Sequence, residues 1–200
     1  MENLYGCRDF RQGWEMELSG VSKYSMGMIE IIQLLPAEAL RFRSIRLRCL
    51  KENPEAFGTT FETANTWDLP NWVTQVERLK TFIATISGND VGVARIAKDE
   101  KNPEIAWVIS MWVAPEARGR KVATQLLQTM IQWATERGVT LLKLDVVDSN
   151  TAAIALYKYL GFKPNGVTGS FPEPRAHITE HQMELGLGEL QTRHVAQDSS

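Results

Sequence analysis

A short basic segment of this 200-residue chain has the composition of an anion-binding turn. It follows an apolar run and precedes a pattern of helical spacing that begins at Val122. N–H groups in the first turn of a helix have no partner within the helix, and the helix dipole places its positive end there. We therefore expect a phosphate site here, and a solvated basic helix start is the alternative. The expected site residues are Arg118, Gly119, Arg120, Lys121, Val122, Ala123 and Thr124.

A second segment places an amide and a phenol at a strand-to-helix junction. It reads Asn150-x-x-Ala153-x-x-Leu156-Tyr157-x-x-x-Gly161-Phe162. Six specified positions coincide by chance on the order of once in ten million starts. Asn150 suits a helix N-cap and equally a ligand contact. Tyr157 places a phenol on the helix, and a tyrosine packed between helix and sheet is its structural interpretation.

Together the two segments resemble the GNAT superfamily of acyl-CoA-dependent N-acetyltransferases. The resemblance covers about Met28 to Leu185, and its specific parts are Met111 to Thr124 and Asn150 to Phe162. It implies a single α/β domain whose mixed, mostly antiparallel central sheet is flanked by helices. It also implies transfer of an acetyl group from acetyl-CoA, the co-substrate, to a primary amine, with no metal.

The resemblance also assigns roles to residues. The arginine–glycine turn cradles the pyrophosphate of coenzyme A, and the central strand binds the pantetheine arm through its backbone at Met111, Trp112 and Val113. Asn150, Ala153 and Tyr157 complete the cofactor site, with Tyr157 as general acid toward the departing sulfur. The family commonly has glycine where this chain has Lys121. We expect Lys121 to take an ordinary right-handed conformation in the first helical turn, with its side chain pointing outward.

The general base is harder to place. Relatives often carry a glutamate or histidine on the central strand, where this chain has Trp107, Val108 and Ser110. Asp145 matches a position used by some relatives and is the expected base. Glu62 and Glu104 are alternatives, as is a water-relayed or external base. A catalytically weak acyl-CoA-binding module or sensor is therefore the alternative function.

The acceptor site is expected between two loops, by the architecture that the resemblance implies. The first is Glu55 to Trp67, and the segment Pro54 to Gly58 within it resembles one branch of the family. The second is Gly166 to Arg175. Carboxylates beside aromatic rings suit an ammonium group, which favours a primary amine or amino acid as acceptor.

The candidate site residues must be positioned by strands and helices that alternate along the chain. Period-2 and helical patterns predict an α/β sheet whose central strand is Ile105 to Val113, because that run is apolar on both faces. The other predicted strands are 28–35, 81–87, 91–97, 141–147, 162 onward and 181–187, with a turn at 88–90. The predicted helices are 36–53, 68–79 with Asp68 as N-cap, 122–134 and 150–160.

Composition narrows the class of protein. The chain has 22 Lys plus Arg against 24 Asp plus Glu, which argues against nucleic acid or an anionic membrane as partner. No apolar run approaches the roughly 20 residues of a membrane span. Two cysteines and three histidines without ligand spacing indicate reduced thiols in a cytoplasmic protein without a metal. We expect an N-terminal extension (1–25), the GNAT-like domain (26–185), a C-terminal tail (186–200), and a monomer or homodimer.

Overall fold

The computed structural model describes residues 28–188. The expected extension 1–25, with Cys7, lies outside the described residues, and so does the tail beyond residue 188. No helix within residues 28–188 has the length and apolar character needed to cross a bilayer.

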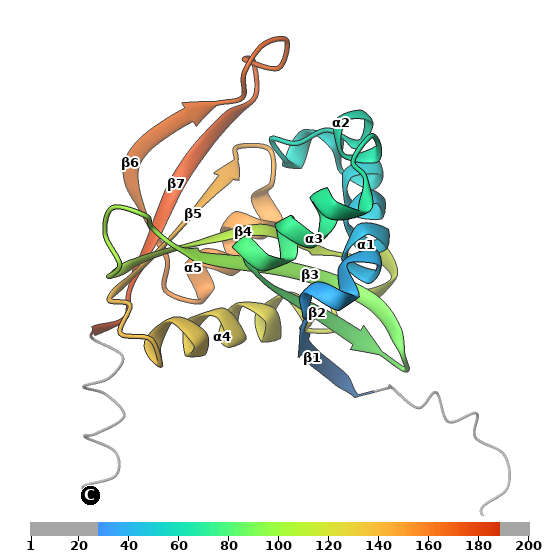
Figure 1. The fold of residues 1–200 in the computed structure, drawn as a ribbon. Coiled ribbons are helices and arrows are strands. Elements are labelled where there is room, and N and C mark those ends of the chain that lie inside the picture. Colours follow the sequence, from blue (N-terminus) through green and yellow to red (C-terminus); the bar gives the residue numbers. More distant parts are fainter. Residues whose placement is uncertain (1–27, 189–200) are drawn as a thin grey trace, which may run out of the picture.

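A seven-stranded sheet forms the centre of the fold, in the order β1-β2-β3-β4-β5-β7-β6 (Figure 1). Neighbouring strands pair antiparallel, except for the parallel pair β4 and β5. This confirms the mixed, mostly antiparallel sheet with Ile105–Val113 in the middle. The strands are β1 (Ile29–Gln33), β2 (Lys80–Ile86), β3 (Asn89–Lys98), β4 (Ile105–Val113), β5 (Leu141–Val147), β6 (Lys163–Ser170) and β7 (Thr179–Gly186).

Helices cover both faces of the sheet. They are α1 (Ala39–Glu52), α2 (Phe61–Asn65), α3 (Leu69–Arg78), α4 (Val122–Thr135) and α5 (Thr151–Tyr159), with short 3-10 turns at Pro36–Glu38, Pro54–Ala56 and Pro115–Ala117. In Figure 1, α4 runs along one face, and α1 and α3 lie on the other. Arg95 of β3 reaches the second face, where its Nη2 donates to the Gln75 carbonyl of α3 at 2.5 Å.

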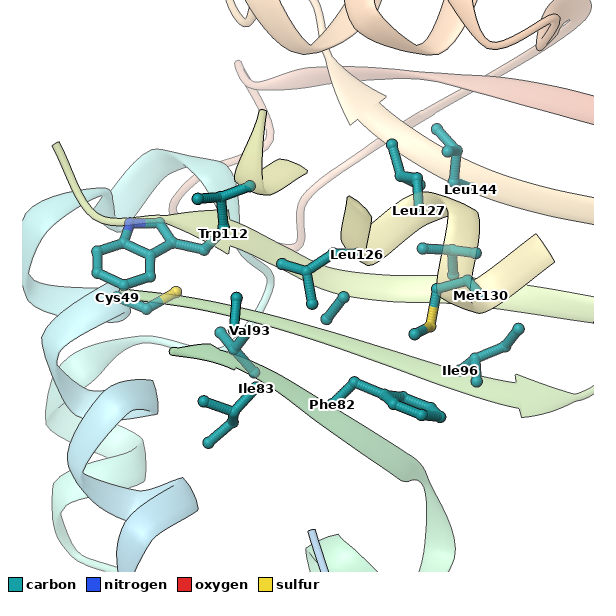
Figure 2. Close-up of a cluster of buried hydrophobic side chains, with 14 of the residues drawn as sticks. Cys49, Phe82, Ile83, Val93, Ile96, Trp112, Leu126, Leu127, Met130 and Leu144 are labelled. Carbon is teal, nitrogen blue, oxygen red and sulfur yellow. The ribbon is translucent and has the colours of Figure 1, made fainter. Parts of the chain in front are cut away.

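The core fills both faces of the sheet, against α4 on one face and against α1 and α3 on the other. Figure 2 shows Leu126, Leu127 and Met130 of α4 over side chains of the central strands. The helix packs closely over β3 at Gly92, where a Cβ would lie 3.0 Å from Val122 Cγ1. Glycine is needed there because the helix would otherwise have to move outward. This close approach sets the height of the α4 N-terminus over the strand ends.

Local sequence signals fixed most element boundaries, with three corrections. Asp68 accepts a hydrogen bond from the Asn71 amide at 3.0 Å, which confirms the N-cap. The β2–β3 turn is Ser87-Gly88 and not residues 88–90, with φ of 51° and 78° at its two positions. Strand β6 continues to Ser170, so the loop expected at 166–175 is residues 171–178. The region 55–67, expected as a loop, contains the short helix α2.

Candidate active site

The central strands β4 and β5 separate at the carboxyl end of the sheet. They pair only from Ile105–Leu141 to Trp107–Lys143, although β4 continues to Val113 and β5 to Val147. Ala114 N–H donates to the Val91 carbonyl of β3 at 2.9 Å. Amides of an extended strand alternate in direction, so the Val113 amide points toward the gap. The gap therefore exposes backbone hydrogen-bonding groups of Met111 and Val113.

A β-bulge interrupts β4 just before this gap. Ile109 pairs with Arg95 and Trp112 with Val93, so Ser110 and Met111 together lie opposite one residue of β3. Ser110 has a left-handed backbone, with φ of 56°. One extra residue reverses the alternation of side chains, so Trp112 shares the α1 face with Ile109. The regular alternation predicted for 105–113 is wrong beyond Ser110 for this reason.

The bulge gives Trp112 a structural role at the site. Its Nε1 donates to Asn53 Oδ1 at 2.8 Å, which joins the end of β4 to the end of α1. The Arg48 guanidinium lies 5.4 Å from its ring centroid. Trp112 is buried, and it fixes the segment after α1 against the carboxyl end of β4.

The basic turn sits at the start of α4, as expected. Lys121 is the N-cap, and no side chain caps this helix. The first intrahelical bond runs from the Gln125 amide to the Lys121 carbonyl, so the amides of residues 122–124 have no partner within the helix. Arg118 Nε donates to the Val113 carbonyl at 3.2 Å, which links the turn to the strand. This arrangement presents N–H groups and cations to an anion.

Lys121 does not have the conformation expected from the sequence. Its φ is 65° and its ψ 12°, which is left-handed, and Gly119 also has a positive φ of 75°. A left-handed backbone costs a non-glycine residue about 1–2 kcal/mol. This is a physical reason for a glycine at the position in relatives, since the turn itself requires φ > 0 there.

We expect Lys121→Gly to stabilise the fold relative to Lys121→Ala by about 1 kcal/mol. Both variants remove the same charge, and only glycine relieves the backbone strain. The difference corresponds to about 2–4 °C in Tm for a chain of this size and is measured by calorimetry. Equal Tm values for the two variants would show that residue 121 is not left-handed in solution.

A cavity of about 520 Å³ joins these parts. Most of the expected residues line it, whereas Arg120 and Asp145 are not among the lining residues. The expected residues found there are Met111, Trp112, Val113, Arg118, Gly119, Lys121, Val122, Ala123, Thr124, Asn150, Ala153 and Tyr157. The residues not foreseen are Asn53, Ala56, Phe57, Ala117, Ala152 and Leu156.

Some of the missed lining residues left a signal in the sequence. Leu156 belongs to the second motif, and Ala56 and Phe57 belong to the segment Pro54 to Gly58 that was assigned to the acceptor. Asn53 left none, because its place depends on the bond from Trp112. A second cavity, of about 320 Å³, shares Asn53, Ala56 and Asn150 with the first.

Tyr157 is buried in the wall of the cavity, with its ring 5.9 Å from that of Phe162. Burial raises its pKa to about 12. Among residues 28–188 the hydroxyl has no hydrogen-bond partner. The ring is packed as in the structural alternative raised from the sequence, whereas the hydroxyl has no partner among the described residues.

Asn150 caps α5 and also faces the cavity. Its Oδ1 accepts from the Ala153 amide at 3.2 Å, which confirms the N-cap. The cap uses the amide oxygen, so Nδ2 can still donate to a ligand. The two roles weighed from the sequence are therefore compatible.

The candidate bases occupy different places. Leu144 lies beside Leu127 of α4 in Figure 2, so strand alternation puts Asp145 on the opposite face of β5. Burial raises the pKa of Asp145, while the bond from Gln182 Nε2 and the charge of Lys143 lower it. Glu62 is exposed on α2. Glu104 precedes β4 at its opposite end, about 30 Å from Val113 by strand rise, and does not reach the cavity.

Other reactive groups lie outside this chemistry. Cys49 is fully buried, and burial raises its pKa to about 12, so its thiolate is not accessible. Within residues 28–188 no three His, Cys, Asp or Glu side chains gather as metal ligands.

Comparison with known proteins matches residues 46–162 to the family model described as the Acetyltransferase (GNAT) family. An uncharacterized N-acetyltransferase of Methanocaldococcus jannaschii is 32% identical over 101 residues. The alignment takes in 48% of this chain and 44% of that relative. The chain thus spans about half the length of the curated relatives it matches.

Solved structures share the fold. The ribosomal-protein-alanine N-acetyltransferase of Brucella melitensis is 26% identical, with a TM-score of 0.65 over 78% of this chain and 99% of that one. The Salmonella typhimurium protein yncA, solved with its cofactor acetyl-CoA, is 18% identical, with a TM-score of 0.65 over 80% of this chain and 94% of that one. At that identity the second comparison bears on the fold alone.

Proposed function

Because this chain belongs to the GNAT acetyltransferase family, we propose that it transfers the acetyl group of acetyl-CoA to a primary amine by direct attack. The observation that carries the proposal is the cavity itself. In it the part of β4 beyond its pairing with β5, the basic turn before α4 and the buried hydroxyl of Tyr157 converge. The amino group acetylated by the Brucella relative, that of an alanine, belongs to the same chemical class.

The residues present fit the cofactor. The amides at residues 122–124 and the cations at 118 and 121 suit the diphosphate, and the Met111 and Val113 backbone suits the amides of a pantetheine arm. We propose Gly119, Arg120, Trp112, Asn150 and Ala153 as further members of this site. When bound, acetyl-CoA supplies a thioester carbonyl that is already activated toward a neutral amine.

The protein's share of the mechanism is electrostatic and geometric. Backbone amides near Met111 to Val113 stabilise the negative charge that develops on the carbonyl oxygen, where preorganised donors are worth several kcal/mol. Tyr157 donates a hydrogen bond to the departing sulfur. Asp145, on the face of β5 that α4 does not cover, accepts the proton of the incoming ammonium, directly or through water.

We expect Asp145→Asn to change the pH dependence of kcat/KM. Burial raises the pKa of Asp145, so the base is lost as the pH falls through that raised value. The kcat/KM of wild type should level off at a pH below the pKa of the amine. That of the variant should keep rising until the pH reaches the pKa of the amine. The loss should be about tenfold at pH 7, below the usual range for acid–base assistance, because Asp145 does not line the cavity and water can take over its role.

Measurement of kcat/KM from pH 6 to 10 checks this, with Glu62→Gln as the matched control. The control should keep the wild-type profile, since Glu62 lies on the exposed side of α2. An Asp145→Asn profile identical to wild type would leave a water-relayed or external base as the remaining mechanism.

One observation favours a second function. Among the residues that line the 520 Å³ cavity there is no carboxylate and no histidine. A catalytically weak acyl-CoA-binding module or sensor would have this lining. Purified protein with acetyl-CoA and a panel of amines, followed by release of free thiol, separates the two. Thermal stabilisation by coenzyme A without amine-dependent thiol release would establish the binding module.

We also propose a cytoplasmic monomer or homodimer that acts on a small-molecule or peptide amine, without nucleic acid or membrane as partner. The near balance of 22 basic and 24 acidic residues supports only the part of this proposal that concerns nucleic acid and an anionic membrane. The domain is proposed to span residues 26–185.

A further inference from the structure

The segment 53–58, here called the wall segment, forms one side of the cavity and is anchored from outside itself. Asn53, Ala56 and Phe57 contribute to the lining. Trp112 holds Asn53 at one end. The buried guanidinium of Arg46 lies 4.6 Å from the ring centroid of Phe57. The segment contains only a short 3-10 turn at Pro54–Ala56 and no sheet pairing, so its position depends strongly on these side-chain contacts.

A third anchor comes from the far end of the chain. Arg175, in the loop between β6 and β7, donates from Nη1 to the Phe57 carbonyl at 2.9 Å and to the Pro54 carbonyl at 3.2 Å. Its Nη2 donates to the Gly58 carbonyl. The guanidinium is also 4.8 Å from the ring centroid of Phe171 in its own loop. One side chain thus satisfies three backbone carbonyls of the wall segment.

This geometry requires an arginine. Guanidinium carries five N–H donors in a planar fork and can serve several acceptors at once, whereas an ammonium acts as a point charge. From the sequence, Arg175 is the last residue of a loop expected to flank the acceptor, and the structure shows its donors turned to backbone carbonyls. Because it joins the two loops proposed to flank the acceptor, the opening between them is bridged.

Resting on the proposed function, we infer that Arg175 is a positioning residue that sets acceptor selectivity. It holds Ala56 and Phe57 against the cavity and bridges the two loops. We expect this bridge to narrow the acceptor entrance, so that unbranched primary amines react better than primary amines with a bulky substituent. Arg175 acts through the wall segment and has no contact with the reacting atoms.

Two amines of similar reactivity test this, n-butylamine and cyclohexylmethylamine. In Arg175→Ala we expect KM for n-butylamine to rise, and the kcat/KM ratio of the bulky to the slim amine to rise about tenfold or more. The ratio for Arg175→Lys should lie between those of wild type and Arg175→Ala, since one ammonium replaces only some of the hydrogen bonds of the guanidinium. Coenzyme A should still stabilise both variants, because Arg175 bonds to the wall segment and not to the turn proposed to hold the diphosphate.

The matched control is Arg137→Ala. Arg137 likewise lies over an aromatic ring, 4.5 Å from the centroid of Trp133, and donates to that residue's carbonyl, but it is remote from the cavity. The Arg137→Ala variant should leave the ratio of kcat/KM for the two amines unchanged. Hydrogen exchange provides a readout independent of turnover, because the wall-segment amides should exchange faster in Arg175→Ala and not in the control.

Failure of the role of Arg175 and failure of the proposed function give different results. An unchanged ratio in a folded, active Arg175→Ala overturns the role of Arg175 alone, and so does unchanged exchange in the wall segment. If that variant does not fold, the same two measurements on Arg175→Lys decide. Absence of thiol release by wild type with any amine overturns the proposed function, and with it the selectivity role.

Discussion

Replacing Tyr157 with Phe is expected to lower kcat about 10²-fold while changing Tm and coenzyme A affinity little. The ring remains packed beside Phe162, so the core keeps its contacts. The lost hydroxyl has no hydrogen-bond partner among the described residues, so its removal should not destabilise the folded state. The effect should fall on kcat because the sulfur gains charge late in the reaction.

The pKa of Tyr157 makes this prediction more specific. At about 12, the phenol stays protonated throughout an assay from pH 6 to 10, so wild type should show no alkaline decline from Tyr157. Complete proton transfer to a thiolate of pKa about 8.5 would be uphill by about 5 kcal/mol. The hydroxyl therefore acts mainly as a hydrogen-bond donor to the sulfur.

Steady-state kinetics of Tyr157→Phe and of Tyr159→Phe check the assignment. Tyr159 lies two residues away on the same helix and is 81% exposed, so its hydroxyl should not matter. A Tyr157→Phe variant with wild-type kcat would refute the role of the hydroxyl. Equal losses in both variants would point to a general effect on α5.

Replacing Gly119 with Val is expected to abolish thermal stabilisation by coenzyme A. At 100 times Kd the ligand stabilises wild type by about 2.7 kcal/mol, or roughly 5–11 °C in Tm. Gly119 has φ of 75°, and a Cβ there would meet no protein atom within 4 Å. The substitution thus strains the turn and crowds the phosphate position without a clash inside the protein.

Gly138→Val is the matched control. Gly138 has φ of 71° and equally open surroundings, but it follows the opposite end of α4. Both variants should lose similar stability from backbone strain, and only Gly119→Val should lose the response to coenzyme A. Retained stabilisation in Gly119→Val would place the diphosphate elsewhere. A wild type that does not respond to millimolar coenzyme A would contradict the cofactor proposal itself.

Local patterns in the sequence were enough for most of the fold. Apolar residues on both sides of Ile105–Val113 placed that strand in the centre of the sheet, because only a strand covered on both faces buries both sets. Asp68 and Asn150 marked helix starts, since their side chains accept from amides three residues on. The basic turn and the Asn150 motif predicted where a ligand would lie, and most of their residues line one cavity.

The tertiary structure decided the features that depend on register and on distant partners. Nothing local marks Ser110 as a bulge, because a bulge exists only relative to the strand it faces, and it alone turns Trp112 toward Asn53. Lys121 is left-handed because the strand end and α4 fix the path of the turn between them. Arg175 bonds to carbonyls more than 100 residues earlier in the chain. Composition and spacing describe each segment alone, whereas these contacts arise only when the sheet brings its loops together.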